Sequence, residues 1–308
     1  MEQTKKKKAL NAFAIGIAVV LVLYVISLFV PVLWALMTTL KSNEEFEGGV
    51  VGGVFYESNK LWWPQYGATL QNYINAYKNF YILVPSTTPG SLGTQYYMFD
   101  QFANSLLYSV GCSITVTAAS LVMAYAAARY TYRMSSWIYT FALLALALPI
   151  VGSLPSEIAV SQQLGIYGSF IGIWIMRGNF LNTYFLIFFA QFKMIPRDYT
   201  EAAKIDGAHP FTIMTKIIFP LASGTIATVF VLAFIGYWND FQIPMVYLPK
   251  YPVAAYGMYR IQIANDTVWG SVPSQTAGVL LMALPIIIFY GIFNRRLNVN
   301  LSVGGIKG

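Results

Sequence analysis

Long stretches with almost no charged side chains constrain this sequence more than any other feature. A membrane-spanning helix needs about 20 mostly apolar residues, because each residue rises about 1.5 Å across a hydrocarbon core of about 30 Å. Six stretches are long enough and contain at most one charge each: residues 9–40, 101–128, 134–156, 171–192, 221–248 and 267–294. The sequence therefore predicts an all-α integral membrane protein with six transmembrane helices.

The composition excludes a water-soluble domain. Only 10% of the residues are charged and 57% are hydrophobic, whereas soluble domains carry about 25% charged residues. The single cysteine, Cys112, excludes an intrachain disulfide framework, and the single histidine, His209, excludes a His-rich metal cluster. We expect no metal and no cofactor. The apolar stretch after Lys5–Lys8 is far longer than a signal-peptide core of roughly 7–15 residues, so we expect it to be retained as a span.

The basic residues orient the predicted spans. If the N-terminus is cytoplasmic, the cytoplasmic loops hold most of the lysines and arginines, and the external loops hold only Lys41, Lys60, Lys78, Lys250 and Arg260. The positive-inside rule then places both termini in the cytoplasm, with an even number of spans. This distribution accounts for the net charge of +7 without a nucleic-acid partner.

The longest predicted external segment runs from about residue 41 to residue 100. It is rich in Gly, Tyr, Trp and Pro and contains no charge-free run long enough to span a membrane. Trp62 and Trp63 fit two interpretations, anchors at the membrane interface or packing within a small external cap. The sequence leaves both open.

Two predicted spans contain a charge, which in a membrane indicates a functional residue by default. Asp240 lies in the run Trp238-Asn239-Asp240, toward the outer end of its span. A place in the translocation pathway or gate and a plain interfacial place both fit it. Arg177 also lies near the outer face, where it could snorkel to the interface or contact a substrate.

The predicted cytoplasmic loop 193–220 is expected to form two short helices. Asp198 is placed as the N-cap of the first, with Glu201 at the capping-box spacing. Gly207 is expected to end this helix with a positive φ, and Pro210 to open the second helix, which runs to Pro220. A protruding pair of this kind fits a docking element, although Glu201 could simply cap its own helix.

The same loop carries a specific resemblance. The spaced residues Glu201, Ala202, Ala203, Gly207, Ile217, Phe219 and Pro220 resemble the EAA loop of binding-protein-dependent ABC importer permeases. Phe219 stands where that family usually has Leu. Further segments resemble the shorter of the two paired permeases in the maltose-type carbohydrate branch: Trp63-Pro64, Thr69-Leu70, Asn72-Tyr73, Tyr256-Gly257-Met258, Ala283-Leu284-Pro285 and Gly304-Gly305-Ile306-Lys307-Gly308.

The resemblance implies a type I ABC importer permease fold in the bacterial cytoplasmic membrane. It divides the chain into a first helix with an external segment (1–103), a five-helix permease core (104–300) and a cytoplasmic tail (301–308). The implied partners are the lipid bilayer, a second paralogous permease, two copies of a cytoplasmic ATP-binding subunit and an external solute-binding protein. The implied function is ATP-driven import of an oligosaccharide.

The resemblance also assigns site residues. The ATPase-coupling residues are Glu201, Ala202, Ala203, Asp206, Gly207 and Pro220. An external loop from about 250 to 275 resembles one that contacts the binding protein, and its candidate contact residues are Tyr256, Gly257, Met258 and Arg260. Candidate pathway or gate residues are Arg177, Trp238, Asn239 and Asp240.

The alternatives belong to other classes of protein. The sequence has no Gly-x-x-x-x-Gly-Lys-Ser/Thr run, so the chain is expected to have no ATPase of its own and to be no enzyme. A gradient-driven secondary transporter is the main alternative, and it usually needs carboxylates or histidines near the membrane midplane. A membrane enzyme would need a cluster of catalytic groups inside the bilayer.

Overall fold

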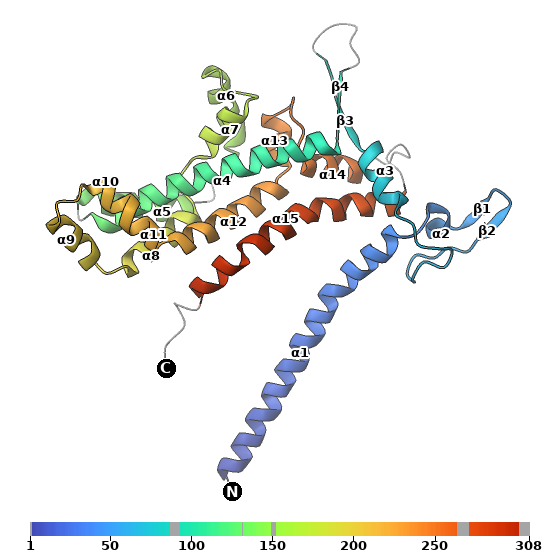
Figure 1. The fold of residues 1–308 in the computed structure, drawn as a ribbon, viewed down its shortest axis with the longest axis horizontal. Coiled ribbons are helices and arrows are strands. Elements are labelled where there is room, and N and C mark those ends of the chain that lie inside the picture. Colours follow the sequence, from blue (N-terminus) through green and yellow to red (C-terminus); the bar gives the residue numbers. More distant parts are fainter. Residues whose placement is uncertain (1, 87–92, 131, 149–151, 264–270, 302–308) are drawn as a thin grey trace. The chain divides into compact units, whose positions relative to one another are not determined.

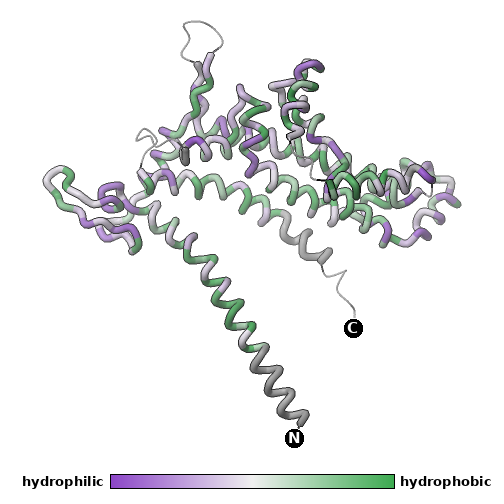
Figure 2. Tube along the Cα trace, turned by 180° about the vertical axis from the view of Figure 1, so that it is seen from behind, coloured by the Kyte–Doolittle hydropathy of each residue, from purple (hydrophilic) through white to green (hydrophobic). Residues whose placement is uncertain are grey.

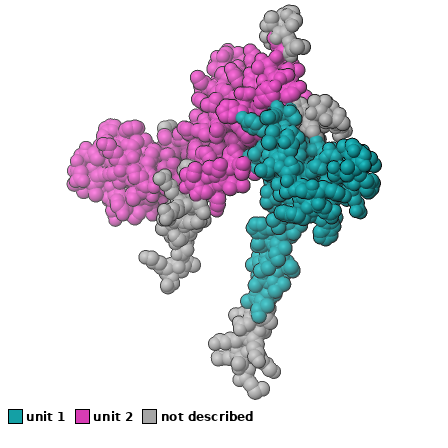
Figure 3. Space-filling view, turned by 45° about the vertical axis from the view of Figure 1, so that its right-hand side comes forward, with its two compact units in different colours: residues 1–80, 264–281 teal, residues 81–263, 282–308 magenta. Residues whose placement is uncertain are grey.

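A computed structural model describes residues 2–86, 93–130, 132–148, 152–263 and 271–301. The chain forms two compact units (Figure 3). One contains residues 1–80 and 264–281, and the other contains residues 81–263 and 282–308. Helix α15 (Val272–Leu301) contributes to both units.

The first unit consists of one long apolar helix and a small, mostly polar cap. Helix α1 (Glu2–Thr39) contains the candidate span Ala14–Thr39, whose side chains are exposed and apolar along most of its length (Figure 2). The cap contains α2 (Asn43–Glu47), the antiparallel hairpin of β1 (Gly49–Val51) and β2 (Val54–Tyr56), and α3 (Gln71–Asn79). This arrangement fits the predicted first span followed by a segment that does not cross the membrane.

The second unit begins with the hairpin of β3 (Tyr81–Val84) and β4 (Thr94–Tyr97), which leads into the long helix α4 (Met98–Arg129). Helix α4 packs against α7 (Phe170–Arg177), α8 (Thr183–Met194) and α12 (Ser223–Asn239) (Figure 1). The remaining elements of this unit are α5 (Arg133–Ala147), α6 (Leu154–Gln163), α9 (Asp198–Ile205), α10 (Pro210–Thr212), the π-helix η1 (Ile213–Ile218), α11 (Phe219–Leu221), α13 (Gln242–Tyr247) and α14 (Ala254–Ile263).

Three helices in the described residues are long and apolar enough to cross a membrane, namely Ala14–Thr39, Met98–Arg129 and Val272–Ile292. A fourth candidate combines Pro210–Leu221 with Ser223–Asn239 across a bend of 76°. The spans predicted at 9–40, 101–128 and 267–294 therefore correspond to long helices. Six spans stay a prediction.

The fourth predicted span, 171–192, is not one continuous helix. Helix α7 ends at Arg177 and α8 begins at Thr183. The side chain of Asn182 accepts a hydrogen bond from the backbone N–H of Phe185, and so caps a new helix inside the apolar stretch. The fifth predicted span, 221–248, is also interrupted, because α12 ends before Asp240 and α13 follows it.

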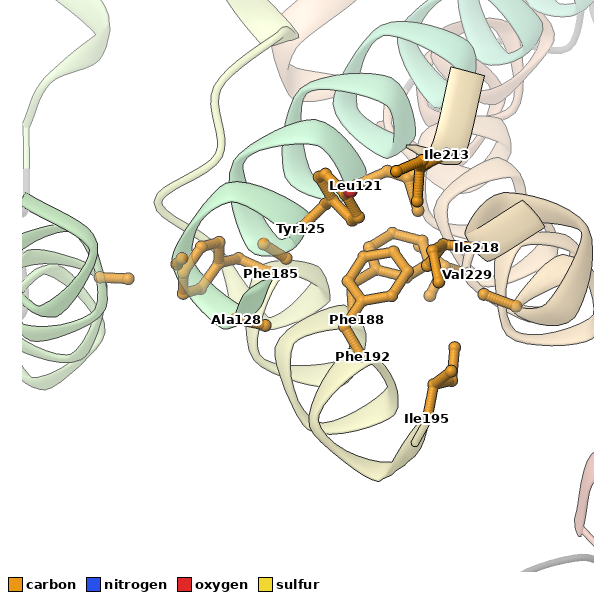
Figure 4. Packing of buried hydrophobic residues seen from close by; sticks show 14 of the residues in the cluster. Leu121, Tyr125, Ala128, Phe185, Phe188, Phe192, Ile195, Ile213, Ile218 and Val229 are labelled. Atoms are coloured by element: carbon orange, nitrogen blue, oxygen red, sulfur yellow. The ribbon is translucent and has the colours of Figure 1, made fainter. Parts of the chain in front are cut away.

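An aromatic cluster forms the main core of the second unit. Phe185, Phe188 and Phe192, which lie on α8, are fully buried. Figure 4 shows side chains that pack around these rings, with Leu121 and Tyr125 on α4, Ile213 and Ile218 on η1 and Val229 on α12. The cluster therefore attaches the segment that follows α8 to the long helices.

Candidate coupling site and pathway residues

Helix α9 forms in the loop where the sequence predicts the first short helix, but its start differs by one residue. The N-cap is Arg197 and not Asp198, and no side chain caps the first turn. Arg197 already has α-helical backbone angles, and its carbonyl accepts bonds from the N–H groups of Thr200 and Glu201. The predicted capping role of Asp198 is therefore wrong. Asp198 and Glu201 instead lie in the first turn, where carboxylates stabilise the helix dipole.

The end of α9 follows the sequence prediction. Gly207 has a φ of +76°, a left-handed conformation that glycine adopts without steric cost. The N–H of Gly207 donates to the carbonyl of Lys204, and the N–H of Ala208 donates to the carbonyl of Ala203. The chain then enters α10 through His209, whose Nδ1 accepts from the N–H of Phe211, with Pro210 in the first turn. The expected helix–turn–helix is present, but its second part consists of α10, the π-helix η1 and α11, which ends at Leu221. The sequence had suggested no role for His209.

The two alanines of the motif lie on different faces of α9. Ala203 is buried and belongs to the aromatic cluster, beside Ile195, Ile213 and Ile218. Glu201, Ala202 and Asp206 are exposed. Ala203 therefore holds the helix against its own unit, and a partner subunit can reach only the other face.

Four large apolar side chains on α9 or on the elements beside it in the sequence face outward: Met194 is 70% exposed, Tyr199 is 49%, Ile205 is 87% and Phe211 is 64%. A soluble loop would gain stability by burying such side chains. The sequence analysis did not single out Ile205. The signal that could have found it is a large apolar residue between two charged residues, Lys204 and Asp206. Exposed apolar groups in a polar setting typically indicate a protein interface.

Phe219, which departs from the family pattern, belongs to a group of three aromatic rings. Its centroid lies 6.1 Å from the ring of Phe192 and 6.0 Å from the ring of Tyr125, and these two rings lie 5.7 Å apart. The larger side chain is therefore accommodated between α8 and α4. Pro220 follows at an exposed position in α11, next to the 76° bend that leads into α12.

Asp240 links three helices. One carboxylate oxygen, Oδ1, accepts from the backbone N–H groups of Gln242 and Ile243 at 3.0 and 3.3 Å, and so caps α13. The other, Oδ2, accepts from the hydroxyl of Tyr108 on α4 at 2.7 Å. Tyr108 is fully buried. The carboxylate therefore has partners within the chain, and one of them, Tyr108, is a residue that the sequence did not single out.

The other candidates on this span differ in accessibility. Trp238 is 2% exposed, its indole N–H donates to the carbonyl of Met282, and its ring stacks on Phe102 at 6.0 Å. Asn239 is exposed and donates to the carbonyl of Ile235 in its own helix. Trp238 is thus part of the core, while Asn239 faces outward.

Arg177 forms an ion pair with Glu157. Its Nη2 donates to Oε2 of Glu157, and both side chains are less than one-third exposed. Glu157 lies on α6 and Arg177 on the last turn of α7, so the ion pair joins two short helices. The charge predicted within a span, Arg177, therefore has an acidic partner within the chain.

The candidate binding-protein contacts lie on a helix, α14. Gly257 and Met258 are buried, Tyr256 is half-buried and Arg260 is exposed. The helix is attached to α4, because the N–H of Ala254 donates to Oγ of Ser105. Tyr256 and Arg260 are therefore the candidates that a partner can reach. Residues 264–270 of the predicted loop lie outside the described residues, as do residues 302–308 of the predicted tail.

None of these arrangements forms a metal site within the described part of the chain, where no three His, Cys, Asp or Glu side chains group together. The main feature of the coupling site is the exposed helix α9, which the buried Ala203 holds in the core and which a 76° bend before α12 follows. Such a geometry can transmit movement between a partner subunit and the long helices.

Comparison with known proteins identifies the family. Residues 96–300 match the model of the binding-protein-dependent transport system inner membrane component. A probable ABC transporter permease protein of Pyrococcus horikoshii is 27% identical over 292 residues, which cover 93% of this chain and 92% of that protein. The trehalose transport system permease protein SugB of Mycobacterium tuberculosis is 30% identical over 73% of this chain and 85% of its own length.

A further relative and a solved structure agree with this result. The maltose/maltodextrin transport system permease protein MalG of Photorhabdus laumondii is 30% identical over 67% of this chain and 71% of its own length. The crystal structure of a bacterial ABC transporter that imports the acidic polysaccharide alginate shares the fold, with a TM-score of 0.71 at 21% identity over 92% of this chain and 96% of that chain. The chain belongs to the family of inner membrane components of binding-protein-dependent transport systems, as a permease subunit of an ABC importer.

Proposed function

We propose that this permease forms half of the translocation pathway of an ATP-driven oligosaccharide importer. In this proposal it pairs with a second, paralogous permease, and two copies of a cytoplasmic ATP-binding subunit supply the work. An external solute-binding protein delivers the sugar. The relatives named for trehalose and for maltose/maltodextrin transport support a carbohydrate substrate.

The proposal includes a topology of six spans with both termini in the cytoplasm. The excess of basic residues in the loops that this topology makes cytoplasmic supports it. The helices α7 and α8 then form one interrupted span, and α5 a short one. Interrupted backbone is tolerated in membranes where protein covers it, and α4 packs against both α7 and α8.

One observation carries the coupling mechanism, namely the two faces of α9. Ala203 anchors the helix in the core, while Glu201, Ala202 and Ile205 face outward. We assign the outward face to a cleft in the ATP-binding subunit. Closure of the two ATP-binding subunits moves the paired α9 helices, and the bend at Pro220 carries this movement into α12.

The roles of the remaining candidates follow from their accessibility. Asn239 is the exposed candidate for the pathway, while Asp240, Trp238 and Arg177 hold helices in place around it. On the external side, Tyr256 and Arg260 are the candidate contacts with the binding protein.

The test is purification of the tagged chain from gently solubilised membranes, followed by mass spectrometry and an uptake assay in proteoliposomes. We expect a second permease, an ATP-binding subunit and a binding protein to co-purify, and sugar uptake to stop when ATP is withheld. Glu201→Ala should lower uptake without lowering the amount of chain in the membrane. Gly207→Asp should do the same, because it places a negative charge at the C-terminal end of α9. A chain that purifies alone and transports on an ion gradient would sink the proposal in favour of a secondary transporter.

A further inference from the structure

The cap of the first unit contains an open cleft that the coupling mechanism does not use. Its volume is about 670 Å³, within the range of roughly 300–1,000 Å³ that is typical of small-molecule sites. The start of α2, the end of β2, the loop before α3 and the first turns of α3 line it. The cleft therefore has the size of a ligand site and lies in the segment that the sequence predicts to be external.

Two tyrosines give the cleft an aromatic wall. The rings of Tyr56 and Tyr66 lie 5.0 Å apart, tilted by 60° to each other. Tyr66 is 49% exposed, and Tyr56 is half-buried. An exposed aromatic ring that carries a polar hydroxyl can pack against an apolar surface and form a hydrogen bond at the same time. Sugars offer both, because their C–H faces are apolar and their edges carry hydroxyls.

Amide side chains also line the cleft. The side chain of Gln71 donates from Nε2 to Oδ1 of Asn75 at 3.0 Å. This bond leaves Oε1 of Gln71 as an acceptor and Nδ2 of Asn75 as a donor. Asn43 also lines the cleft, and it is exposed. Paired donors and acceptors of this kind suit hydroxyl groups, which both donate and accept.

The floor of the cleft is rigid. Asn72 is buried, and its Nδ2 donates to the carbonyls of Thr39 and Lys41 at 2.8 and 2.6 Å. Its Oδ1 accepts from Oγ of Ser274 at 3.1 Å. Because all of these bonds lie within the unit, Asn72 stays in place whether the cleft is empty or filled. A fixed floor lowers the entropy cost of binding a ligand.

The loop that presents Tyr66 is also held in place. The N–H of Gln65 donates to Oε1 of Glu45 at 2.7 Å, and the same oxygen accepts from Nδ2 of Asn59. Glu45 and Asn59 are both buried. Gly67 then turns the chain with a φ of +102°. The aromatic wall is thus attached to a buried polar network and does not depend on a free loop.

The single charged residue of the lining, Glu44, favours a neutral ligand over an acidic one. Among the described lining residues, Glu44 is the only charged one. A carboxylate with no cation beside it repels acidic ligands and accepts hydrogen bonds from hydroxyls. We propose that this cleft binds a neutral sugar unit of the transported oligosaccharide on the external side of the permease. This inference rests on the proposed carbohydrate function and adds a site to it.

The test measures binding of trehalose, maltotriose and diacetylchitobiose to the full chain in lipid nanodiscs, with no binding protein present. We expect at least one of these sugars to bind, and Tyr66→Ala to weaken that binding by about tenfold, since the ring supplies the main apolar contact. Tyr66→Phe should retain most of the affinity. The matched control is Tyr77→Ala, because Tyr77 is 51% exposed on α3 but does not line the cleft.

A second arm tests the charge argument. Glu44→Gln should leave the affinity for the neutral sugar within about twofold and should raise the affinity for a trigalacturonate, which carries carboxylates. The inference is overturned if none of the three neutral sugars binds, or if Tyr66→Ala and Tyr77→Ala bind sugar equally well. It is also overturned if Tyr66→Ala leaves sugar binding unchanged and, in a separate titration of the same nanodiscs with the binding protein, lowers only the affinity for that protein, because the cleft would then be a protein contact. Failure of ATP-driven uptake by the unaltered importer would instead contradict the proposed function.

Discussion

Replacement of Gly207 by alanine tests the geometry of the coupling helix. Gly207 has a φ of +76°, and a Cβ built on it would meet no atom within 4 Å. The cost of an alanine is therefore a backbone cost alone, about 1–2 kcal/mol for a residue with a Cβ in the left-handed region. A free-energy change of this size lowers the ratio of formed to frayed helix end by roughly 5- to 30-fold.

The fraying would break the bonds from the N–H groups of Gly207 and Ala208 to the carbonyls of Lys204 and Ala203. We expect Gly207→Ala to lower ATP-driven uptake in proteoliposomes several-fold, with the amount of chain in the membrane nearly unchanged. Gly207→Asn should retain most of the activity, because asparagine tolerates the left-handed region. Gly16→Ala is the control, since it adds the same methyl group in open space at a helical position.

The comparison between Gly207→Ala and Gly207→Asn separates a backbone effect from a lack of space for any side chain. If Gly207→Asn fails as badly as Gly207→Ala, the docking partner has no room for any side chain, and the backbone argument is wrong. If both variants transport normally, the left-handed end of α9 has no part in coupling.

Three further predictions concern stability. Phe192→Ala should lower the free energy of unfolding by about 3–5 kcal/mol, because a fully buried ring is removed from the core. Thermal unfolding in detergent measures the loss, and an unchanged unfolding midpoint would contradict the burial of Phe192. Tyr108→Phe leaves one oxygen of Asp240 without its partner and should lower the free energy of unfolding by about 1–3 kcal/mol in the same assay. A loss of less than about 0.3 kcal/mol would mean that water replaces the hydroxyl as the partner of Asp240. Burial lowers the pKa of Lys41, and the nearby carboxylate of Glu45 offsets only part of this shift. The unfolded chain therefore binds more protons at this side chain than the folded chain, and the free energy of unfolding should rise as the pH approaches the usual pKa of lysine. Lys41→Met should remove this dependence of the free energy of unfolding on pH.

The parts of the fold that the sequence predicts well depend on local signals. The long apolar stretches predict α1, α4 and α15 because length and hydropathy alone decide whether a helix can cross a membrane. The end of α9 is equally local, since only Gly207 offers a residue that takes a positive φ easily. The interruption between α7 and α8 is harder to predict, because the Asn182 cap lies within a run that still averages as apolar.

The candidate site could be predicted only in part, because orientation and partners depend on tertiary packing. Ala202 and Ala203 are adjacent and identical, and only the packing of α9 determines that Ala203 is buried. Asp240 and Tyr108 are 132 positions apart in the sequence, so their hydrogen bond could not be read from either segment. The loops around the cleft are held by buried hydrogen bonds of Glu45 and Asn72, for which hydropathy gives no signal.

Site-directed cross-linking can determine whether the outward face of α9 docks onto a separate ATP-binding subunit. The single native cysteine, Cys112, is buried, so Cys112→Ala gives a suitable background for Ile205→Cys and Ala203→Cys. We expect a cysteine at the 87% exposed position 205 to cross-link to the ATP-binding subunit in the assembled importer, and one at the buried position 203 not to. Equal cross-linking from both positions, or none from position 205, would contradict this docking.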